Sequence, residues 1–442
     1  MPDALPSKKP EPQWAAFVAL DWGDQKHYWK LQDAASPQCR GGELDNTPEA
    51  LESWAADLAY RYAGGPIAVC LEQSRGAVVY QLSKYPHLVL FPVHSTTSAR
   101  FRQAIRPSGS KSDAEDCAVL LDLLLHHRDC LRRLDPDSAE TRLLQLLVEQ
   151  RRTFVNERTR HSNRLTNWLK MYFPQVLDWI DNIDSPLGCD FLERWPTLEQ
   201  LQHSRRGTVH EFFLQHNSRS EERIEERIAA MYAANPAVRD KAMLDAGPMI
   251  TKEIVGLVRA LNSAIEELDK RIEKLTEAHP DKAVFANVPG AGPALLPRLI
   301  VAFGTKRERY QTAAELQRYS GIAPVTEQSG KTRYVHVRRA CPKFLRQTFH
   351  EFAGHSLNKS AWARAFYDQK RSEGQGHHAA VRALAYKWIR VLFRCWKSNT
   401  PYDEQKYVQA LQKRHAPLVN LLGTGVKWKN VAGFQKLCLE NS

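Results

Sequence analysis

Short apolar runs separated by polar turns fill the first hundred residues of the chain and then stop. The runs at 14–20, 66–71 and 87–93 have the length and composition of buried strands, and 27–32 is typical of a partly alternating strand. From about residue 137 to 280 the apolar residues instead follow helical spacing. We therefore expect an α/β amino-terminal domain followed by a mainly helical region.

Four acidic residues stand where these elements begin or end. Asp21 ends the apolar run that begins at residue 14, and Glu72 follows the run at 66–71. Asp113 and Asp116 follow Ser112 in a Ser-x-x-Glu pattern that predicts a helix start, so both fall on one face of its first turn. Negative charge at a helix start also stabilises the helix dipole, which is the alternative explanation of the aspartate pair.

Carboxylates gathered in this way are the ligands that Mg²⁺ prefers. Mg²⁺ takes oxygen ligands and keeps water, and two such ions roughly 3.5–4 Å apart can stabilise both the attacking and the leaving oxygen of a phosphodiester. Without a cation, four neighbouring carboxylates repel one another. The four acids therefore predict a site for Mg²⁺ or Mn²⁺ that loses its metal when one acid is removed.

Composition limits the class of protein. The chain has 442 residues and a formal net charge of +12, which allows two or three domains and favours a polyanionic partner. Its eight cysteines form no Cys-x-x-Cys pair and no zinc-site spacing, so we expect reduced thiols and a cytoplasmic location. We find no long apolar span or signal peptide and expect no membrane association. Residues 1–13 are rich in Pro and Lys and predict a flexible tail.

The middle of the chain predicts two long helices. The second carries one apolar stripe with steps of four and three residues, which predicts a coiled coil or an antiparallel helical hairpin. The stripe consists of Ile250, Ile254, Leu257, Leu261, Ile265, Leu268, Ile272 and Leu275. It is explained either by self-association of chains or by packing against the first helix, at 138–170. Residues 184–246 show no clear pattern.

The first helix is rich in arginine, including Arg151 and Arg152. The planar guanidinium group suits phosphate, so this helix is a candidate nucleic-acid track, and a solvated helix face is the alternative. Farther along, Gly290 and Gly292 make a tight turn between helical segments. Exposed amides in such a turn can approach a phosphate, as in helix-hairpin-helix DNA binders, whereas a plain interhelical turn needs no ligand.

Ser329 precedes Gly330 in a segment that we expect to be a loop. The sixteen residues from Lys331 to Arg346 include no acid. Their basic candidates for nucleic-acid binding are Lys331, Arg333, Arg338, Arg339, Lys343 and Arg346. A serine in a glycine loop is usually a turn former, but beside so much positive charge it is also a candidate nucleophile, because the cations would stabilise charge on a phosphoryl group.

In their order along the chain, these segments resemble the DEDD-type insertion-sequence transposases, the family described as bridge-RNA-guided recombinases. The resemblance runs from about Phe17 to Trp396. It rests on Asp21, Glu72, Lys111–Asp116, Pro289–Pro293, Gly321–Pro324 and Gln328–Gly330. It implies four regions after the tail: a ribonuclease-H-like (RuvC-like) α/β domain at 14–136, a helical coiled-coil connector at 137–280, a mainly α transposase domain with a helix-hairpin-helix-like turn at 281–400, and an extension at 401–442.

The resemblance also implies a reaction. Asp21, Glu72, Asp113 and Asp116 would hold Mg²⁺ against the scissile phosphate. Ser329 would attack that phosphate, and the covalent phosphoserine link would let a free 3′-hydroxyl reseal the strand without ATP. In such enzymes the acids and the serine come from different subunits of a homo-oligomer, here a dimer or tetramer, and a structured bridge RNA pairs with donor and target DNA.

This sequence departs from the family pattern in two places. Trp22 follows the first Asp near a position where a small residue and a lysine are common, and Cys117 replaces the usual Ala after the last Asp. A second serine, Ser320, precedes the Gly321 break and lies farther from the basic run, so Ser329 is the predicted nucleophile.

Two other function classes stay open. A structure-selective nuclease, such as a Holliday-junction resolvase, would need the acids but not Ser329. An inactive nucleic-acid-binding derivative would need neither.

Overall fold

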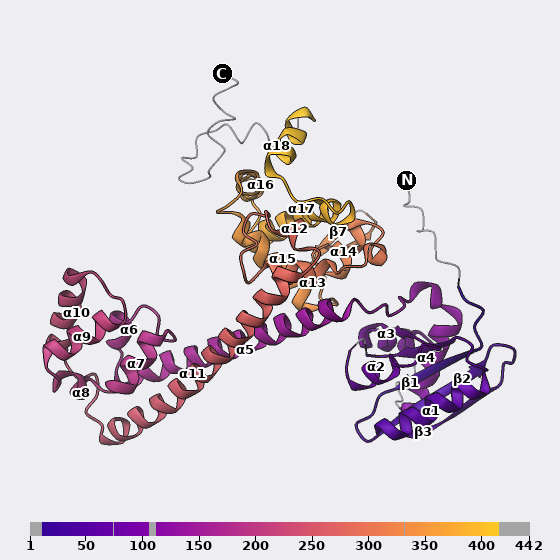
Figure 1. Cartoon of the computed structure of the whole chain (residues 1–442), viewed down its shortest axis with the longest axis horizontal. Helices are drawn as coiled ribbons and strands as arrows, with labels where there is room; N and C mark the ends of the chain where they lie inside the picture. Colours follow the sequence, from indigo (N-terminus) through magenta and orange to yellow (C-terminus); the bar gives the residue numbers. More distant parts are fainter. Residues whose placement is uncertain (1–10, 74, 106–111, 331, 415–442) are drawn as a thin grey trace. The chain divides into compact units, whose positions relative to one another are not determined.

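The computed structural model describes residues 11–73, 75–105, 112–330 and 332–414. The chain forms two compact units, Met1–Pro136 and Asp137–Ser442. The first is a mixed α/β unit built on a sheet and the second is mainly helical, as expected (Figure 1). Among the helices of the described residues, none has both the length and the apolar character needed to cross a membrane.

The amino-terminal unit contains a five-stranded sheet in the order β3-β2-β1-β4-β5. Strands β1, β2 and β3 are joined antiparallel, whereas β4 and β5 run parallel to β1. The strands are β1 (Ala16–Asp21), β2 (Lys26–Asp33), β3 (Cys39–Asp45), β4 (Ile67–Leu71) and β5 (Leu88–Pro92). The four strands predicted from apolar runs are confirmed. Strand β3 is missed, because its CRGGELD sequence is polar and largely exposed.

Helices cover both faces of this sheet, because alternate residues of a strand point to opposite sides. Val18 and Leu20 of β1 pack in one core, and Ala19 between them packs in another. The first core contains side chains of α1 (Pro48–Arg61) and α2 (Ala77–Leu82), and the second contains those of α4 (Asp113–His126). Two further elements complete the unit, α3 (Ser95–Ile105) and the short 3-10 helix η1 (Arg128–Cys130).

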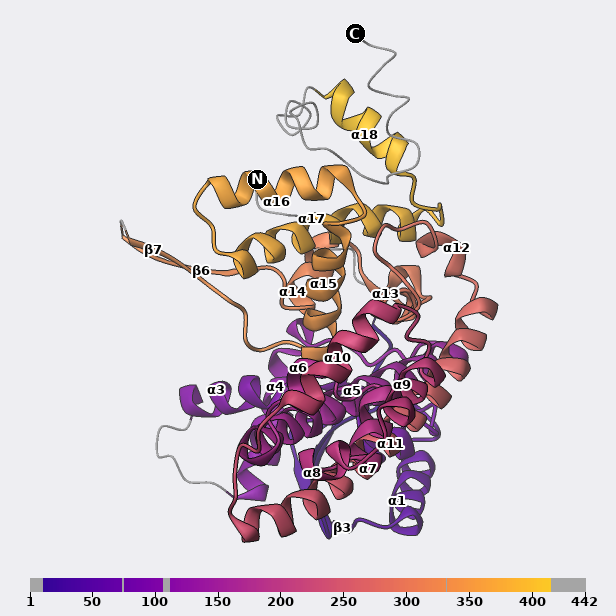
Figure 2. The same ribbon diagram turned by 90° about the vertical axis from the view of Figure 1, so that its left-hand side faces the viewer.

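In the second unit, two long helices, α5 (Ala139–Tyr172) and α11 (Lys241–Ala278), lie side by side (Figures 1 and 2). Arg151 of α5 donates a hydrogen bond to Asp269 of α11, and Trp168 donates one to the Gly247 backbone oxygen. Because the later residue of α5 meets the earlier residue of α11, the two helices run antiparallel. The apolar stripe of α11 therefore packs against α5 within the chain, as the hairpin explanation predicts. Leu257 on the same stripe remains 47% exposed.

A helical module joins the far ends of α5 and α11. Its core is aromatic, with Phe191, Trp195, Phe212 and Phe213 in mutual ring contact. Its helices are α6 (Val176–Trp179), α7 (Pro186–Arg194), α8 (Leu198–Gln202), α9 (Arg206–Gln215) and α10 (Glu221–Ala233). Helices this short give no long periodic pattern, which explains why this segment was not interpretable from sequence.

The carboxy-terminal part has a core built around three fully buried tryptophans, Trp362, Trp388 and Trp396. An exposed β-hairpin projects from it (Figure 2). The helices are α12 (Lys282–Phe285), α13 (Leu296–Phe303), η2 (Arg307–Arg309), α14 (Ala313–Tyr319), α15 (Lys343–Ser356), α16 (Ala361–Ser372), α17 (His377–Lys397) and α18 (Glu404–Lys413). The hairpin strands are β6 (Val325–Ser329) and β7 (Thr332–His336).

Candidate active site

The sheet places the first two acids at one edge. Strands β1 and β4 are parallel neighbours, with Leu20 opposite Leu71. Asp21 is the last residue of β1, and Glu72 directly follows β4. Because neighbouring parallel strands end at the same edge, the two carboxylates are adjacent.

Helix α4 brings the second pair of acids to this edge. Ser112 caps the helix by accepting a hydrogen bond from the Glu115 amide, as predicted, so Asp113 and Asp116 lie in its first turn. The buried Cys117 thiol lies 3.0 Å from the backbone oxygen of Tyr28 and 3.6 Å from that of Ala19. This side chain therefore holds the start of α4 against β1 and β2, and the departure at this position is structurally accommodated.

The electrostatics of Asp21 show that the four acids are neighbours. Burial raises the pKa of Asp21 to about 6, and the negative charges of Glu72, Asp116 and Asp113 add to the rise. An aspartate in water loses its proton far more readily, because here both burial and the neighbouring negative charges disfavour the ionised carboxylate. All three other acids lie close enough to Asp21 for their charges to raise its pKa, but no three of the four have ligand atoms within 4.8 Å of one another.

Helix α3 contributes two residues that the sequence reasoning missed. The buried Ser98 hydroxyl donates a hydrogen bond to Glu72, and the Arg102 guanidinium forms an ion pair with Asp116. Ser98 and Arg102 are four residues apart and so share one helix face. A serine and an arginine four residues apart, just before the predicted acids, could have indicated polar partners for those acids. Arg102 offsets part of the negative charge, and Ser98 orients the Glu72 carboxylate.

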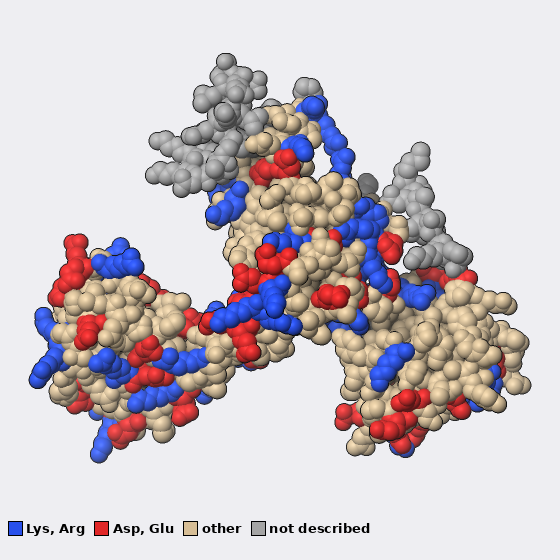
Figure 3. All heavy atoms as spheres, in the orientation of Figure 1, with Lys and Arg blue, Asp and Glu red and all other residues tan. Residues whose placement is uncertain are grey.

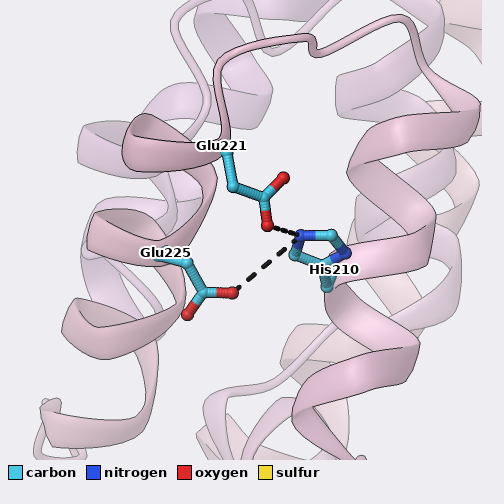
Figure 4. Close-up of side chains that lie close together, drawn as sticks. All are labelled: His210, Glu221 and Glu225. Carbon is cyan, nitrogen blue, oxygen red and sulfur yellow. Dashed lines mark hydrogen bonds and ion pairs between the residues drawn. The ribbon is translucent and has the colours of Figure 1, made fainter.

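The donor set fits a hard divalent cation. All four candidate ligands are carboxylates, which suit Mg²⁺ or Mn²⁺, and the raised pKa of Asp21 indicates that further positive charge would be stabilised. Among the described residues, a tighter metal-type triad lies in the helical module, where His210, Glu221 and Glu225 have ligand atoms within 4.8 Å of one another (Figure 4). There the 2.6 Å hydrogen bond between His210 and Glu221 accounts for the arrangement.

Ser329 lies on the β-hairpin, and the predicted loop is wrong. It is the last residue of β6 and pairs with Thr332 of β7, while Gly330 begins the turn with a φ of 56°. Ser329 is exposed. The other candidate, Ser320, is fully buried and donates its hydroxyl hydrogen bond to the Gln317 backbone.

Basic residues lie on β7 and in the segment that follows it. Arg333 is exposed on β7, and Arg338 and Arg339 follow the strand. Lys343 begins α15, where Arg346 donates a hydrogen bond to the backbone oxygen of Arg338. Lys331 lies outside the described residues.

Two predicted nucleic-acid contacts have partners within the chain. Arg151 forms an ion pair with Asp269 of α11, and Arg152 lies 3.0 Å from Glu351 of α15. Glu351 also accepts a hydrogen bond from the buried Arg298, which holds the pKa of this carboxyl below its usual value against the opposing effect of burial. Arg151 therefore joins the two helices of the hairpin, and Arg152 connects the hairpin to α15.

The glycine turn between α12 and α13 packs closely on α15. Gly290 has a φ of 85°, and a Cβ atom there would lie 2.9 Å from the backbone of His355 and Ser356. Gly292 is exposed, and a Cβ atom there would meet nothing within 4 Å. Close helix packing explains Gly290, whereas Gly292 has no such structural requirement.

Comparison with known proteins gives two matches in separate parts of the chain. A transposase family model of the DEDD IS110 type matches residues 18–174, and a model of the transposase IS116/IS110/IS902 family matches residues 282–368. The first match contains all four acids, and the second contains Ser329 and the glycine turn. Most of the helical module lies between the two matched ranges.

Two relatives align with most of the chain and a third with about a third of it. The putative mini-circle transposase for IS117 of Streptomyces coelicolor is 26% identical over 90% of this chain and 97% of its own length. The 43.6 kDa protein of insertion element IS110 from the same organism is 26% identical over 88% of this chain and 96% of its own length. The pilin gene-inverting protein of Moraxella bovis is 26% identical over 34% of this chain and 48% of its own length.

The two glycines allow a matched test of the turn. Gly290→Ala should lower the free energy of unfolding by about 1–3 kcal/mol or more, because alanine is strained at positive φ and its Cβ meets α15. Gly292→Ala should change it by less than about 0.5 kcal/mol. Urea unfolding followed by tryptophan fluorescence measures both. Equal effects of the two substitutions would contradict the packing role of Gly290.

Asp21 should make stability depend on pH. Since its pKa is raised to about 6, the folded protein holds this proton more tightly than the unfolded chain does. The resulting stabilisation is fully present at acid pH, below the unfolded value, and is lost as pH rises through about 6. In metal-free buffer, Asp21→Asn should therefore raise the melting temperature well above pH 6 and lose this advantage at acid pH, whereas the exposed control Asp24→Asn should not.

The same melting assay tests the cation. Mg²⁺ should raise the melting temperature of the unaltered protein above pH 6 and less so below it, because a protonated carboxyl is a poor ligand. The Asp21→Asn variant should show little response. A magnesium response that is the same in this variant as in the unaltered protein would place the metal elsewhere.

Proposed function

Because this chain belongs to the IS110/IS116 family of insertion-sequence transposases, we propose that it cuts and rejoins DNA through a covalent link to Ser329. The acids Asp21, Glu72, Asp113 and Asp116 complete the reaction centre by binding a divalent cation. Donor and target DNA are the substrates.

The observation that carries this proposal is the effect of the other three acids on the carboxyl of Asp21. Residues up to 95 positions apart in sequence raise the pKa of Asp21 together. The strand order β3-β2-β1-β4-β5, with acids at the ends of β1 and β4, supports the ribonuclease-H-like (RuvC-like) assignment of residues 14–136. A boundary between the two units at Pro136 supports the same domain limit.

The metal-binding acids act by position and charge. When bound, Mg²⁺ or Mn²⁺ would polarise the scissile phosphate and stabilise the leaving oxygen. Asp21 must be deprotonated to be a ligand, so its raised pKa predicts weaker metal binding in acid. The hydrogen bond from Ser98 orients the Glu72 carboxylate. Arg102 forms an ion pair with Asp116, which would also be a metal ligand.

Ser329 has the exposure that a nucleophile for a large substrate requires. Its oxygen would bond to phosphorus as its proton departs to a base, and the 3′ oxygen of the cut strand would leave as a hydroxyl. Arg333 and Arg338 supply positive charge near the hairpin, which favours the developing negative charge.

Assembly and guidance belong to the same proposal. The acids and Ser329 meet in a homo-oligomer, a dimer or tetramer, with each reaction centre shared between subunits. A structured bridge RNA selects donor and target DNA, and the net charge of +12 supports partners of this kind. Residues 137–280 serve as the helical connector, 281–400 as the transposase domain and 401–442 as its extension.

Replacement of Ser329 tests the covalent step. Protein purified from cells that carry its element, with any co-purifying RNA, should form a denaturation-resistant protein–DNA adduct. Ser329→Ala should reduce adduct and strand exchange by roughly 10⁴-fold or more, as loss of a nucleophile does in hydrolases. The control Ser320→Ala removes only a buried hydrogen bond to Gln317 and should keep the adduct.

The other outcomes separate the alternative functions. If Ser329→Ala still nicks DNA at the original rate, the protein is a metal-dependent nuclease. If Asp21→Asn leaves nicking, adduct formation and strand exchange unchanged, the acids have no catalytic role and the protein is a nucleic-acid-binding derivative.

A further inference from the structure

A hollow of about 540 Å³ lies on one face of the helical hairpin, between α5 and α11. Arg160, Asn163, Arg164 and Asn167 line it from successive turns of α5, and Trp168 and Ile254 are among its apolar walls. A volume of this order is typical of a site for a small organic group. The hollow is remote in sequence from Ser329, and none of the four acids contributes to it.

The charge of the hollow favours an anion. Arg160 and Arg164 are exposed, lie one turn apart, and make no ion pair with any described residue. Two neighbouring arginines of α5 differ, because Arg151 pairs with Asp269 and Arg158 lies 3.6 Å from Asp184. The lining contains no acidic side chain. Two uncompensated guanidinium groups on one helix face are suited to phosphate oxygens.

The other residues that line the hollow suit a ligand that carries polar and apolar groups besides phosphate. The amides of Asn163 and Asn167 offer hydrogen-bond donors and acceptors, again one turn apart. The Trp168 indole is held by a hydrogen bond from its Nε1 to the Gly247 backbone oxygen, and Ile254 is 2% exposed. Cationic, amide and apolar groups in one hollow match the phosphate, the edge and the face of a nucleotide.

We propose that this hollow binds an unpaired segment of a nucleic-acid strand, with phosphates on Arg160 and Arg164 and a base against Trp168. A base stacked inside a duplex cannot enter a hollow, whereas one in a loop or a displaced strand can. The site rests on the proposed function only in that the protein handles nucleic acid. It requires neither the acids nor Ser329.

The test measures equilibrium binding to the full-length protein over a series of potassium chloride concentrations. Fluorescent oligo-uridine, oligo-thymidine and a DNA duplex of equal length are the probes, read by anisotropy. In Arg160→Gln/Arg164→Gln, affinity for the single strands should fall at least about tenfold at low salt. The slope of log affinity against log salt should fall by about 1.4, because two phosphate contacts contribute about 0.7 each.

A charge-matched control separates the hollow from the general positive charge of the protein. Arg219 and Arg223 are exposed residues before and within α10, outside the hollow. Arg219→Gln/Arg223→Gln makes the same change in net charge and should leave the slope unaltered. Asn163→Ala/Asn167→Ala should weaken binding without changing the slope, since it removes hydrogen bonds and no charge.

Each other result decides the matter. Equal slope changes in the two arginine pairs would overturn the site, as would an equal loss of affinity for the duplex. A changed oligomeric state in light scattering with unchanged oligonucleotide affinity would make the hollow an interface between copies. Tighter binding of oligo-uridine assigns an RNA loop through its 2′-hydroxyl groups, and tighter binding of oligo-thymidine assigns a displaced DNA strand. Failure of the Ser329 chemistry leaves all these readouts intact.

Discussion

Burial of the Asp21 carboxyl beside three other acids is the constraint on which the rest of the candidate site depends. Asp21 lies half-buried beside three other acids, and its raised pKa measures the cost of ionising it there. The surrounding structure keeps the acids together: parallel strands end at one edge, Cys117 anchors α4, and Arg102 offsets Asp116. A bound cation would stabilise the ionised form of Asp21, which is disfavoured in the metal-free site. The same disfavoured ionisation therefore underlies both the raised pKa and the proposed metal binding.

In the second unit the basic residues fall into two groups, those that pair with acids and those that remain exposed. Those near the carboxy-terminal core are neutralised, as in the contacts of Arg152 and Arg298 with Glu351. Figure 3 accordingly shows acids and bases interleaved on parts of this unit. Other basic groups remain exposed, on the β-hairpin that carries Ser329 and in the hollow that Arg164 lines. Since paired guanidinium groups bind phosphate poorly, the exposed basic groups are the ones that remain available to an anion.

Local signals in the sequence were sufficient for much of the fold. Apolar runs predicted four strands, Ser112 predicted the start of α4, and the apolar stripe predicted that α11 packs along one face. Strand β3 was not predictable because it is polar and exposed, so burial left no pattern in it. The hairpin had a usable signal in the β-forming residues Thr332, Tyr334 and Val335, but their basic neighbours suggested a binding loop instead.

The sequence by itself determined which residue types are available for the proposed phosphodiester chemistry. Carboxylates at the ends of predicted elements, and a basic run without acids, are local patterns that can be recognised along the chain. Tertiary structure decided what each residue does. Only folding shows that Gly290 packs on α15, that Arg151 is bound to Asp269, and that Ser98 and Arg102 reach the acids. Ion pairs and close contacts join residues far apart in the chain, so local pattern carries no record of them.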